Sequence, residues 1–131
     1  MAGRASVSKG KRGEHAAVRQ LRVVWPEAER TGHRQRNART RVPDVEGTPF
    51  WFEIKNQKRV NVREAFAQAE LDAESDGRTP VVVYKEDGRR EWMVAMALGE
   101  LAWKTDLDKV PLKDCDMLVH VELRDWLAVM A

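Results

Sequence analysis

The sequence predicts an α/β domain in which helices flank one central mixed β-sheet. Residues 80–85, which read PVVVYK, are apolar with almost no alternation, as in a strand buried on both faces. Asp87-Gly88 follows at once and is a hairpin signal, so residues 91–96 are expected to return as the antiparallel neighbour. Strand patterns of this kind alternate with helical patterns along the chain, and that order predicts helices packed on one sheet.

Local signals mark the ends of the elements. Apolar residues recur at helical spacing over residues 13–24, and Pro26 ends that helix. Asn61 and Glu64 form a capping-box pattern, and Gly77 stops the helix that follows. The predicted elements in chain order are a helix at 13–24, a short strand at 26–30, an exposed loop at 31–41, a strand from 42 to 45, a strand at 50–55, a helix at 62–75, strands at 80–85 and 91–96, a helix at 97–104, a strand at 117–122 and a helix at 124–130.

Length and composition describe one domain. The chain has 131 residues, of which 43% are hydrophobic and 34% are charged, so it can bury a sizeable core. No apolar run reaches the ~18 residues of a membrane span, and no apolar segment near the N-terminus resembles a secretory signal. Cys115 is the sole cysteine, which excludes an internal disulfide and a cysteine-based zinc site. We therefore expect a cytoplasmic protein without a membrane partner.

Charge is distributed unevenly along the chain. Residues 1–43 hold 11 Lys and Arg against 3 Glu, whereas residues 44–131 hold 12 Lys and Arg against 18 Asp and Glu. A basic end on an acidic body indicates a polyanionic partner, with a solvated tail as the alternative. We expect residues 1–12 to form a flexible basic arm and residues 13–131 to form the domain. The candidate DNA-binding residues are Lys9, Lys11, Arg12, Arg34, Arg36, Arg39, Arg41, Lys58 and Arg59.

The stretch PDVEGTPFWFEIKNQKR, residues 43–59, carries the candidate chemistry. Side chains of a strand alternate between its faces, so Glu53 and Lys55 share one face, about 6.5–7 Å apart. If Asp44 pairs with Glu53, their β-carbons lie about 4.5–5.5 Å apart, and carboxylates so close favour a cation between them. Oxygen ligands without sulfur favour Mg²⁺ or Mn²⁺. Lys55 would then orient a water molecule or stabilise charge on the phosphorane.

The Glu53-Ile54-Lys55 triplet taken alone is weak evidence for a catalytic site. A chain of this composition contains an acid-x-Lys triplet about once by chance, and this chain has one. The alternative is an ordinary strand end with a surface ion pair, which stabilises a protein very little. His15, His33 and His120 lack the spacing of metal ligands.

The order of several residues resembles the PD-(D/E)xK nuclease superfamily. Glu14 on the first helix, Pro43-Asp44 at a strand, Glu53-Ile54-Lys55 after an apolar strand and Gln68 on the next helix follow one another in that order. Within the superfamily, residues 10–96 resemble the small archaeal-type and phage-type Holliday junction resolvases. The resemblance implies a restriction-endonuclease-like core. The metal-binding groups that it implies are Asp44, Glu53, the carbonyl of Ile54 and, directly or through water, Glu14.

The resemblance also implies catalytic roles and a substrate. Lys55 matches the catalytic lysine, and Gln68 resembles a glutamine near the site, with a solvated helix residue as its alternative. The expected function is Mg²⁺-dependent cleavage of branched DNA, in which Mn²⁺ substitutes, by a phage-encoded or prophage-derived resolvase of four-way junctions. The alternatives are a related nuclease that cuts forks, flaps or single strands, and a DNA-binding module of the same fold that does not cut.

Two nicks on opposed strands of a junction require two sites, so we expect a homodimer. Trp51 shares the face of Glu53, where it stacks on a base or packs against a neighbouring helix. The apolar residues that suit a dimer surface are Leu71, Trp103, Leu127 and Met130.

Overall fold

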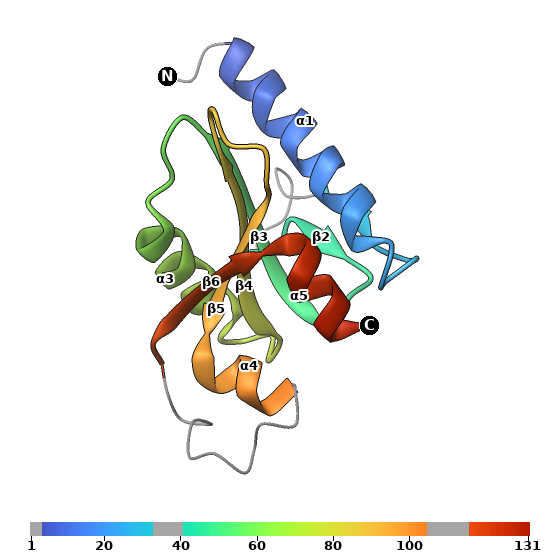
Figure 1. The fold of residues 1–131 in the computed structure, drawn as a ribbon, viewed down its shortest axis with the longest axis vertical. Coiled ribbons are helices and arrows are strands. Elements are labelled where there is room, and N and C mark those ends of the chain that lie inside the picture. The colour runs from blue at the N-terminus through green and yellow to red at the C-terminus, as the bar shows by residue number, and fades with distance from the viewer. Residues whose placement is uncertain (1–3, 33–40, 105–115) are drawn as a thin grey trace.

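A computed structural model describes residues 4–32, 41–104 and 116–131, and these form the predicted α/β architecture (Figure 1). The elements are α1 (Arg4–Leu21), β1 (Glu29–Arg30), β2 (Val45–Glu46), β3 (Phe50–Gln57), α3 (Val62–Ala73), β4 (Thr79–Glu86), β5 (Met93–Ala97), α4 (Leu98–Lys104), β6 (Leu118–Glu122) and α5 (Leu123–Met130). The central sheet has the strand order β3–β4–β5–β6. β3 runs parallel to β4, and the other two pairs are antiparallel, so the sheet is mixed. No helix within the described ranges is long and apolar enough to cross a membrane.

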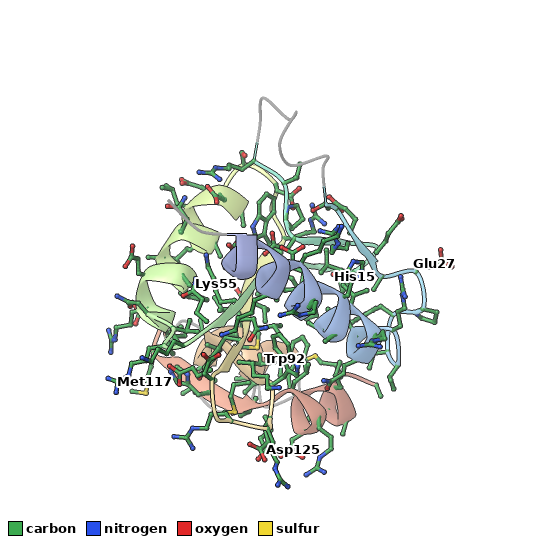
Figure 2. All side chains as sticks on the ribbon, turned by 90° about the horizontal axis from the view of Figure 1, so that it is seen from above. His15, Glu27, Lys55, Trp92, Met117 and Asp125 are labelled. Carbon is green, nitrogen blue, oxygen red and sulfur yellow. The ribbon has the colours of Figure 1, made fainter. Side chains whose placement is uncertain are left out.

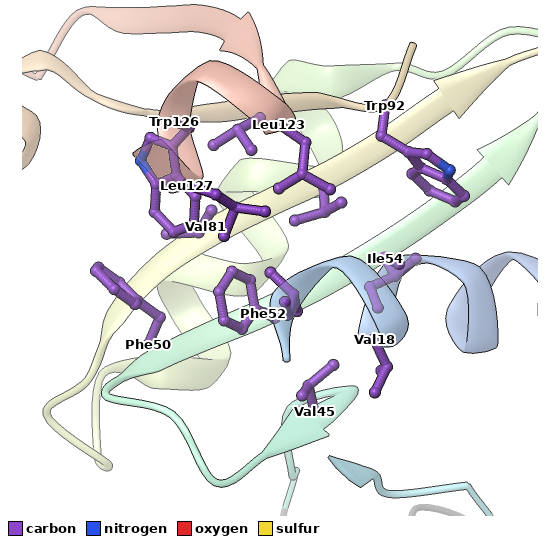
Figure 3. Close-up of a cluster of buried hydrophobic side chains, with 14 of the residues drawn as sticks. Val18, Val45, Phe50, Phe52, Ile54, Val81, Trp92, Leu123, Trp126 and Leu127 are labelled. Carbon is purple, nitrogen blue, oxygen red and sulfur yellow. The ribbon is translucent and has the colours of Figure 1, made fainter. Parts of the chain in front are cut away.

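Helices cover both faces of the sheet (Figure 1). α1 and α5 pack on one face, where Val18 and Leu127 meet the aromatic side chains of β3 in one buried cluster (Figure 3). The rings of Trp25, Phe50, Phe52 and Trp126 lie with their centroids 5.3–6.0 Å apart, mostly tilted or edge to face, as aromatic cores prefer.

The opposite face of the sheet packs against α3. Phe66 of α3 lies in a second buried cluster with Val82 and Tyr84 of β4. Ala69 and Ala73 contact Trp51 of β3. Small alanine side chains let the helix approach the strand closely, so the large indole fills the space between them. β3 is therefore held from both sides, and its orientation is fixed.

Most of the local sequence signals are confirmed. Val81 to Tyr84 are all buried, as the unbroken apolar run predicts. Asn61 Oδ1 accepts a hydrogen bond of 3.1 Å from the Glu64 amide at the start of α3. Gly77 has a φ of +85° just beyond α3, and its amide donates to the carbonyl of Ala73 at 3.0 Å. A left-handed residue there ends the helix at little cost only when it is glycine.

The first helix begins well before its predicted start at residue 13. α1 starts at Arg4, inside the segment that we expected to be a flexible arm. Lys9 forms an ion pair with Asp87 at the β4–β5 turn, and Asn56 Nδ2 donates to the Lys9 carbonyl at 3.3 Å. These contacts fasten an early turn of α1 to the sheet. The helix also ends at Leu21, short of residue 24, in a turn closed by the Trp25 amide on the Leu21 carbonyl at 2.9 Å.

The predicted strand from residue 42 to 45 is shorter than expected and has a different partner. β2 holds only Val45 and Glu46, and it pairs antiparallel with β1, not as a regular hairpin with β3. Pro43 has no N–H to donate, which limits the ladder on that side. The Asp44 amide nevertheless donates to the Phe52 carbonyl at 2.9 Å. The chain therefore passes along the edge of β3 at the point where the candidate carboxylates lie.

Two of the residues predicted for a dimer surface belong to the core instead. Leu127 is only 6% exposed, and Met130 packs against the same cluster, because α5 is amphipathic and turns both toward β3. Leu71 is 64% exposed and remains on the surface. The side chain of Trp103 and all of Cys115 lie outside the described part of the chain.

Candidate active site

β3 presents Glu53 and Lys55 on the face of the sheet that α3 covers. Phe52 and Ile54 point to the opposite face and are buried under α1 and α5, so the alternation along the strand is fixed by the core. Lys55 Nζ lies 3.5 Å from Glu53 Oε1. The strand therefore delivers a carboxylate and an ammonium side by side on a rigid support.

These two side chains line a groove between β3 and α3. Gln68 and Glu64 of α3 form its opposite wall, and Asn61 lies at the start of the helix. The groove has a volume of about 250 Å³. Since a water molecule occupies about 30 Å³ in the liquid, the groove has room for a phosphate group or a hydrated cation.

Burial raises the pKa of the Glu53 carboxyl above its ordinary value, because the surrounding protein withholds water from the charged form. The ammonium of Lys55 opposes this rise through its charge and its hydrogen bond. Asp72 adds to the rise and Arg41 opposes it, in both cases through charge. A cation bound beside Glu53 would stabilise its charged form, and perturbed groups of this kind are typical of functional sites.

Asp44 is buried beside Glu53, at the edge of β3 that β4 does not occupy. Asp44 is only 6% exposed, and its Oδ2 accepts a hydrogen bond of 2.7 Å from the Ile54 amide. On the other side, the Thr31 amide donates to the Asp44 carbonyl at 3.0 Å. Asp44 is thus fixed between β1 and β3, with its carboxylate against the residue that separates Glu53 from Lys55.

The oxygen atoms at this edge suit a hard divalent cation. The N–H and C=O of one strand residue point to the same edge, so the Ile54 carbonyl faces the side on which Asp44 lies. Two carboxylates and a carbonyl are donors that Mg²⁺ and Mn²⁺ prefer. Within residues 4–32, 41–104 and 116–131, no group of three or more His, Cys, Asp or Glu side chains converges to hold a metal ion. An ion here would depend on Asp44, Glu53, the Ile54 carbonyl and water.

Glu14 does not join these carboxylates. Its Oε2 accepts a hydrogen bond of 2.8 Å from Arg30 Nη1, and both side chains are mostly buried. Arg30 is paired with Val45, the residue after Asp44, so this ion pair lies beside the strand that follows the site. The structure thus directs the Glu14 carboxylate to a guanidinium and not to the predicted metal site. Sequence spacing cannot foresee this, because β1 brings Arg30 to Glu14.

Asp72 is a neighbour of the site that sequence reasoning missed. Gln68 Nε2 donates to Asp72 Oδ1 at 2.9 Å, and Arg41 Nε lies 3.8 Å from the same oxygen. The Asp72 side chain is 12% exposed, and its charge acts on Glu53. The one available signal was the four-residue spacing of Gln68 and Asp72, which places them on one side of a helix.

Trp51 packs against a helix, which was the second of its two predicted roles. It is only 2% exposed and lies on Ala69 and Ala73. The guanidinium of Arg78 sits 5.5 Å from the centre of its ring. A base therefore cannot stack on this indole in the present arrangement.

The candidate DNA-binding residues are scattered over several surfaces. Lys9 is paired with Asp87, Arg41 lies near Asp72, and Arg12 lines a groove beside α1. Lys11, Lys58 and Arg59 are exposed. Arg34, Arg36 and Arg39 lie outside the described residues.

Comparisons of the chain with protein-family models, with curated proteins and with solved structures find no match. The function must therefore be inferred from the chemistry of the site itself.

Proposed function

We propose that this protein is a metal-dependent endonuclease that hydrolyses phosphodiester bonds in branched DNA. The observation that carries the proposal is the 3.5 Å pair of Glu53 and Lys55, with the Asp44 carboxylate bound to the amide of the residue between them. We further propose that the core is restriction-endonuclease-like and belongs to the PD-(D/E)xK type. The mixed sheet, with Asp44 at the edge of β3 and Glu53 on the face that α3 covers, supports that assignment.

Asp44, Glu53 and the Ile54 carbonyl would hold Mg²⁺ or Mn²⁺, which polarises a phosphodiester and lowers the pKa of a bound water when present. The ammonium of Lys55 lies beside this set and donates hydrogen bonds to the attacking water or to a phosphate oxygen. Its charge opposes the negative charge that develops on phosphorus. Because β3 is packed on both faces, the backbone of Lys55 is held in place next to Glu53.

Gln68 approaches the same groove from α3. Its amide nitrogen is committed to Asp72, so its Oε1 remains as an acceptor. A water molecule between the two side chains would donate a hydrogen bond to this oxygen and accept one from the Lys55 ammonium. In this proposal Asp72 fixes the orientation of Gln68, and Gln68 in turn orients the water that attacks.

We propose four-way junctions as the preferred substrate, cut by a homodimer with one site per chain. The substrate has near two-fold symmetry, and paired nicks require two sites related in the same way. A nuclease for forks, flaps or single strands would use an identical site. A module that only binds DNA is disfavoured, because such a module has no need for the arrangement of Asp44, Glu53 and Lys55 around Ile54.

The test is a panel of labelled four-way junction, fork, flap, duplex and single-stranded DNA, incubated with Mg²⁺, with Ca²⁺ and with EDTA. We expect cleavage of the junction with Mg²⁺, binding without turnover with Ca²⁺, and no cleavage with EDTA. Lys55→Ala should lose at least tenfold in rate, which corresponds to about 1.4 kcal/mol of transition-state stabilisation. Lys85→Ala is the matched control, since Lys85 lies on the neighbouring strand with its side chain on the opposite face.

Two results would contradict the proposal. If Lys55→Ala cuts at more than about a tenth of the wild-type rate, Lys55 does not have the assigned role. If no DNA of the panel is cut with Mg²⁺ or Mn²⁺ although the junction is bound, the module that only binds is the correct reading.

A further inference from the structure

A second groove lies between α1 and β1, away from Glu53 and Lys55. It has a volume of about 740 Å³. In Figure 2, His15 lies on α1 to the side away from α3, whereas Lys55 lies between α1 and α3. The groove is therefore separate from the candidate active site, and no role in the proposed reaction uses it. Its basic lining residues are Arg12, His15, Arg19, Arg22 and Arg30.

The basic residues of α1 form one stripe. Arg12, His15, Arg19 and Arg22 recur at intervals of three or four residues, so they fall on one side of α1 and its final turn. The buried residues of α1, such as Leu21, lie on the opposite side and fix the helix against the sheet. The stripe therefore faces outward as a consequence of core packing, and Arg30 of β1 completes the groove.

Two of the arginines are held in place and two are not. Arg22 Nε donates to the Ala28 carbonyl at 2.8 Å, and Arg30 Nη1 donates to Glu14 at 2.8 Å. Each keeps further N–H donors, because a guanidinium has five. Arg12 and Arg19 are exposed and form no ion pair with any residue in the described ranges. Glu29 also lines the groove and Arg30 is paired with Glu14, so Arg12, Arg19 and Arg22 leave an excess of positive charge there, and this excess favours an anion.

The length of the basic stripe indicates which kind of anion it can bind. Ten residues separate Arg12 from Arg22, and a helix rises 1.5 Å per residue, so the stripe is about 15 Å long. Phosphates of one DNA strand are spaced by about 3.4 Å along the helix axis. The stripe is therefore too long for a single phosphate ion and suits a polymer that carries several phosphates in a row.

We infer that this groove binds the sugar-phosphate backbone of DNA at a distance from the bond that is cut. The identity of the polymer as DNA rests on the proposed function. Phosphate contacts position a protein on DNA without reading sequence, so the groove contributes affinity for all DNA sequences. The chemistry of cleavage stays on β3, and the two sites should respond separately to mutation.

The test compares two double variants of equal charge. Arg12→Ala with Arg19→Ala removes two exposed guanidinium groups of the groove, and alanine keeps the helix intact. Arg89→Ala with Arg90→Ala removes two exposed arginines of the β4–β5 turn and serves as the control. Binding to junction and duplex DNA is measured in Ca²⁺ over a range of salt concentrations, and cleavage is measured in Mg²⁺ at saturating DNA.

We expect the groove variant to bind every DNA at least tenfold more weakly and to lower the slope of log K against log salt by roughly 1.8. The control variant should keep the wild-type affinity and slope, and it should also keep the wild-type rate at saturating DNA. Arg12→Lys with Arg19→Lys should restore the slope, because the slope counts charges on phosphate.

Each other outcome has a definite meaning. Equal losses in the groove variant and the control would show that only net charge matters, and this would overturn the inference, as would no loss in either. A wild-type protein that binds no DNA overturns both this inference and the proposed function. A wild-type protein that binds through the groove but cuts no DNA leaves the groove assigned and removes the nuclease.

Discussion

The amide of Ile54 donates a hydrogen bond of 2.7 Å to Oδ2 of Asp44 at the open edge of β3. This bond joins two segments ten residues apart in the sequence and sets the Asp44 carboxylate beside the Glu53-Ile54-Lys55 triplet. A charged acceptor at this position gives a bond stronger than one between neutral groups. The same contact thus stabilises the chain and places a candidate metal ligand, and the two effects can be separated by substitution.

Asp44→Ala should destabilise the protein, and Asp44→Asn should do so far less. Alanine leaves the Ile54 amide without this acceptor in a buried place, which costs about 1–3 kcal/mol. Asparagine keeps an oxygen for that amide but removes the charge. Both variants should lose at least 100-fold in cleavage, or about 2.7 kcal/mol in the transition state. Urea denaturation and single-turnover cleavage measure the two effects, and an active Asp44→Asn would remove Asp44 from the metal site.

Glu53→Gln should make the metal-free protein more stable at neutral pH. Burial raises the pKa of Glu53 in the folded state above the ordinary value of 4.5. Between the pKa of Glu53 in the unfolded chain and its higher pKa in the folded protein, the folded state binds more protons than the unfolded state. The free energy of unfolding therefore falls as pH rises through this range. The variant does not titrate, so its advantage should be absent below about pH 4 and should grow as pH rises toward neutrality.

The measurement for Glu53 is thermal unfolding in EDTA across that pH range. Glu70→Gln, at an exposed position on α3, is the matched control for the removal of one carboxylate from this region. If Glu53→Gln is less stable than the wild type at neutral pH, the ion pair with Lys55 outweighs the cost of burial.

Gly13→Ala and Gly10→Ala should have opposite effects on stability, although both replace a glycine within α1. A β-carbon at Gly13 would lie 2.6 Å from the β-carbon of Asn56, so α1 or β3 must move. A β-carbon at Gly10 would meet nothing within 4 Å. Gly10→Ala should therefore stabilise the protein by about 0.5–1 kcal/mol through helix propensity.

At Gly13 the clash should exceed that gain and destabilise the protein by about 1–3 kcal/mol. Because Asn56 follows Lys55, Gly13→Ala should also slow cleavage, whereas Gly10→Ala should not. The denaturation midpoints of the two variants test this prediction. Equal shifts of the midpoint would mean that α1 does not contact β3 closely at Gly13.

These contacts also show what the sequence could predict and what it could not. The apolar run of β4, the cap at Asn61 and the alternation along β3 depend on neighbouring residues, so local patterns predict them. The early start of α1 depends on Lys9 and Asp87, which are 78 residues apart in the chain. No periodicity reports such a contact, and a basic segment without an apolar stripe looks like an arm.

The candidate site likewise has some features that local sequence predicts and others that depend on distant contacts. Glu53 and Lys55 share a face because strands alternate, and the sequence predicts that. The pairing of Glu14 with Arg30, and the closeness of Asp72 to Glu53, depend on where β1 and α3 come to lie. A list of residues in the right order therefore predicts which strand carries the chemistry. It does not predict which charges surround that strand.

The protein should be a homodimer in solution if it resolves four-way junctions. One chain has a mass of 15.0 kDa and one candidate site, whereas paired nicks need two sites. Of the apolar residues first considered for the interface whose side chains the structure describes, Leu71 is the one that is exposed, at 64%. Leu71→Asp should weaken the dimer at least tenfold, since a charge cannot be buried there unpaired. Val23→Asp is the control, because Val23 is 79% exposed and lies on the far side of the sheet, after α1.

Light scattering during size-exclusion chromatography, with and without junction DNA, gives the mass directly. A wild-type mass near that of one chain in both cases would exclude the dimer and favour a nuclease of flaps or single strands.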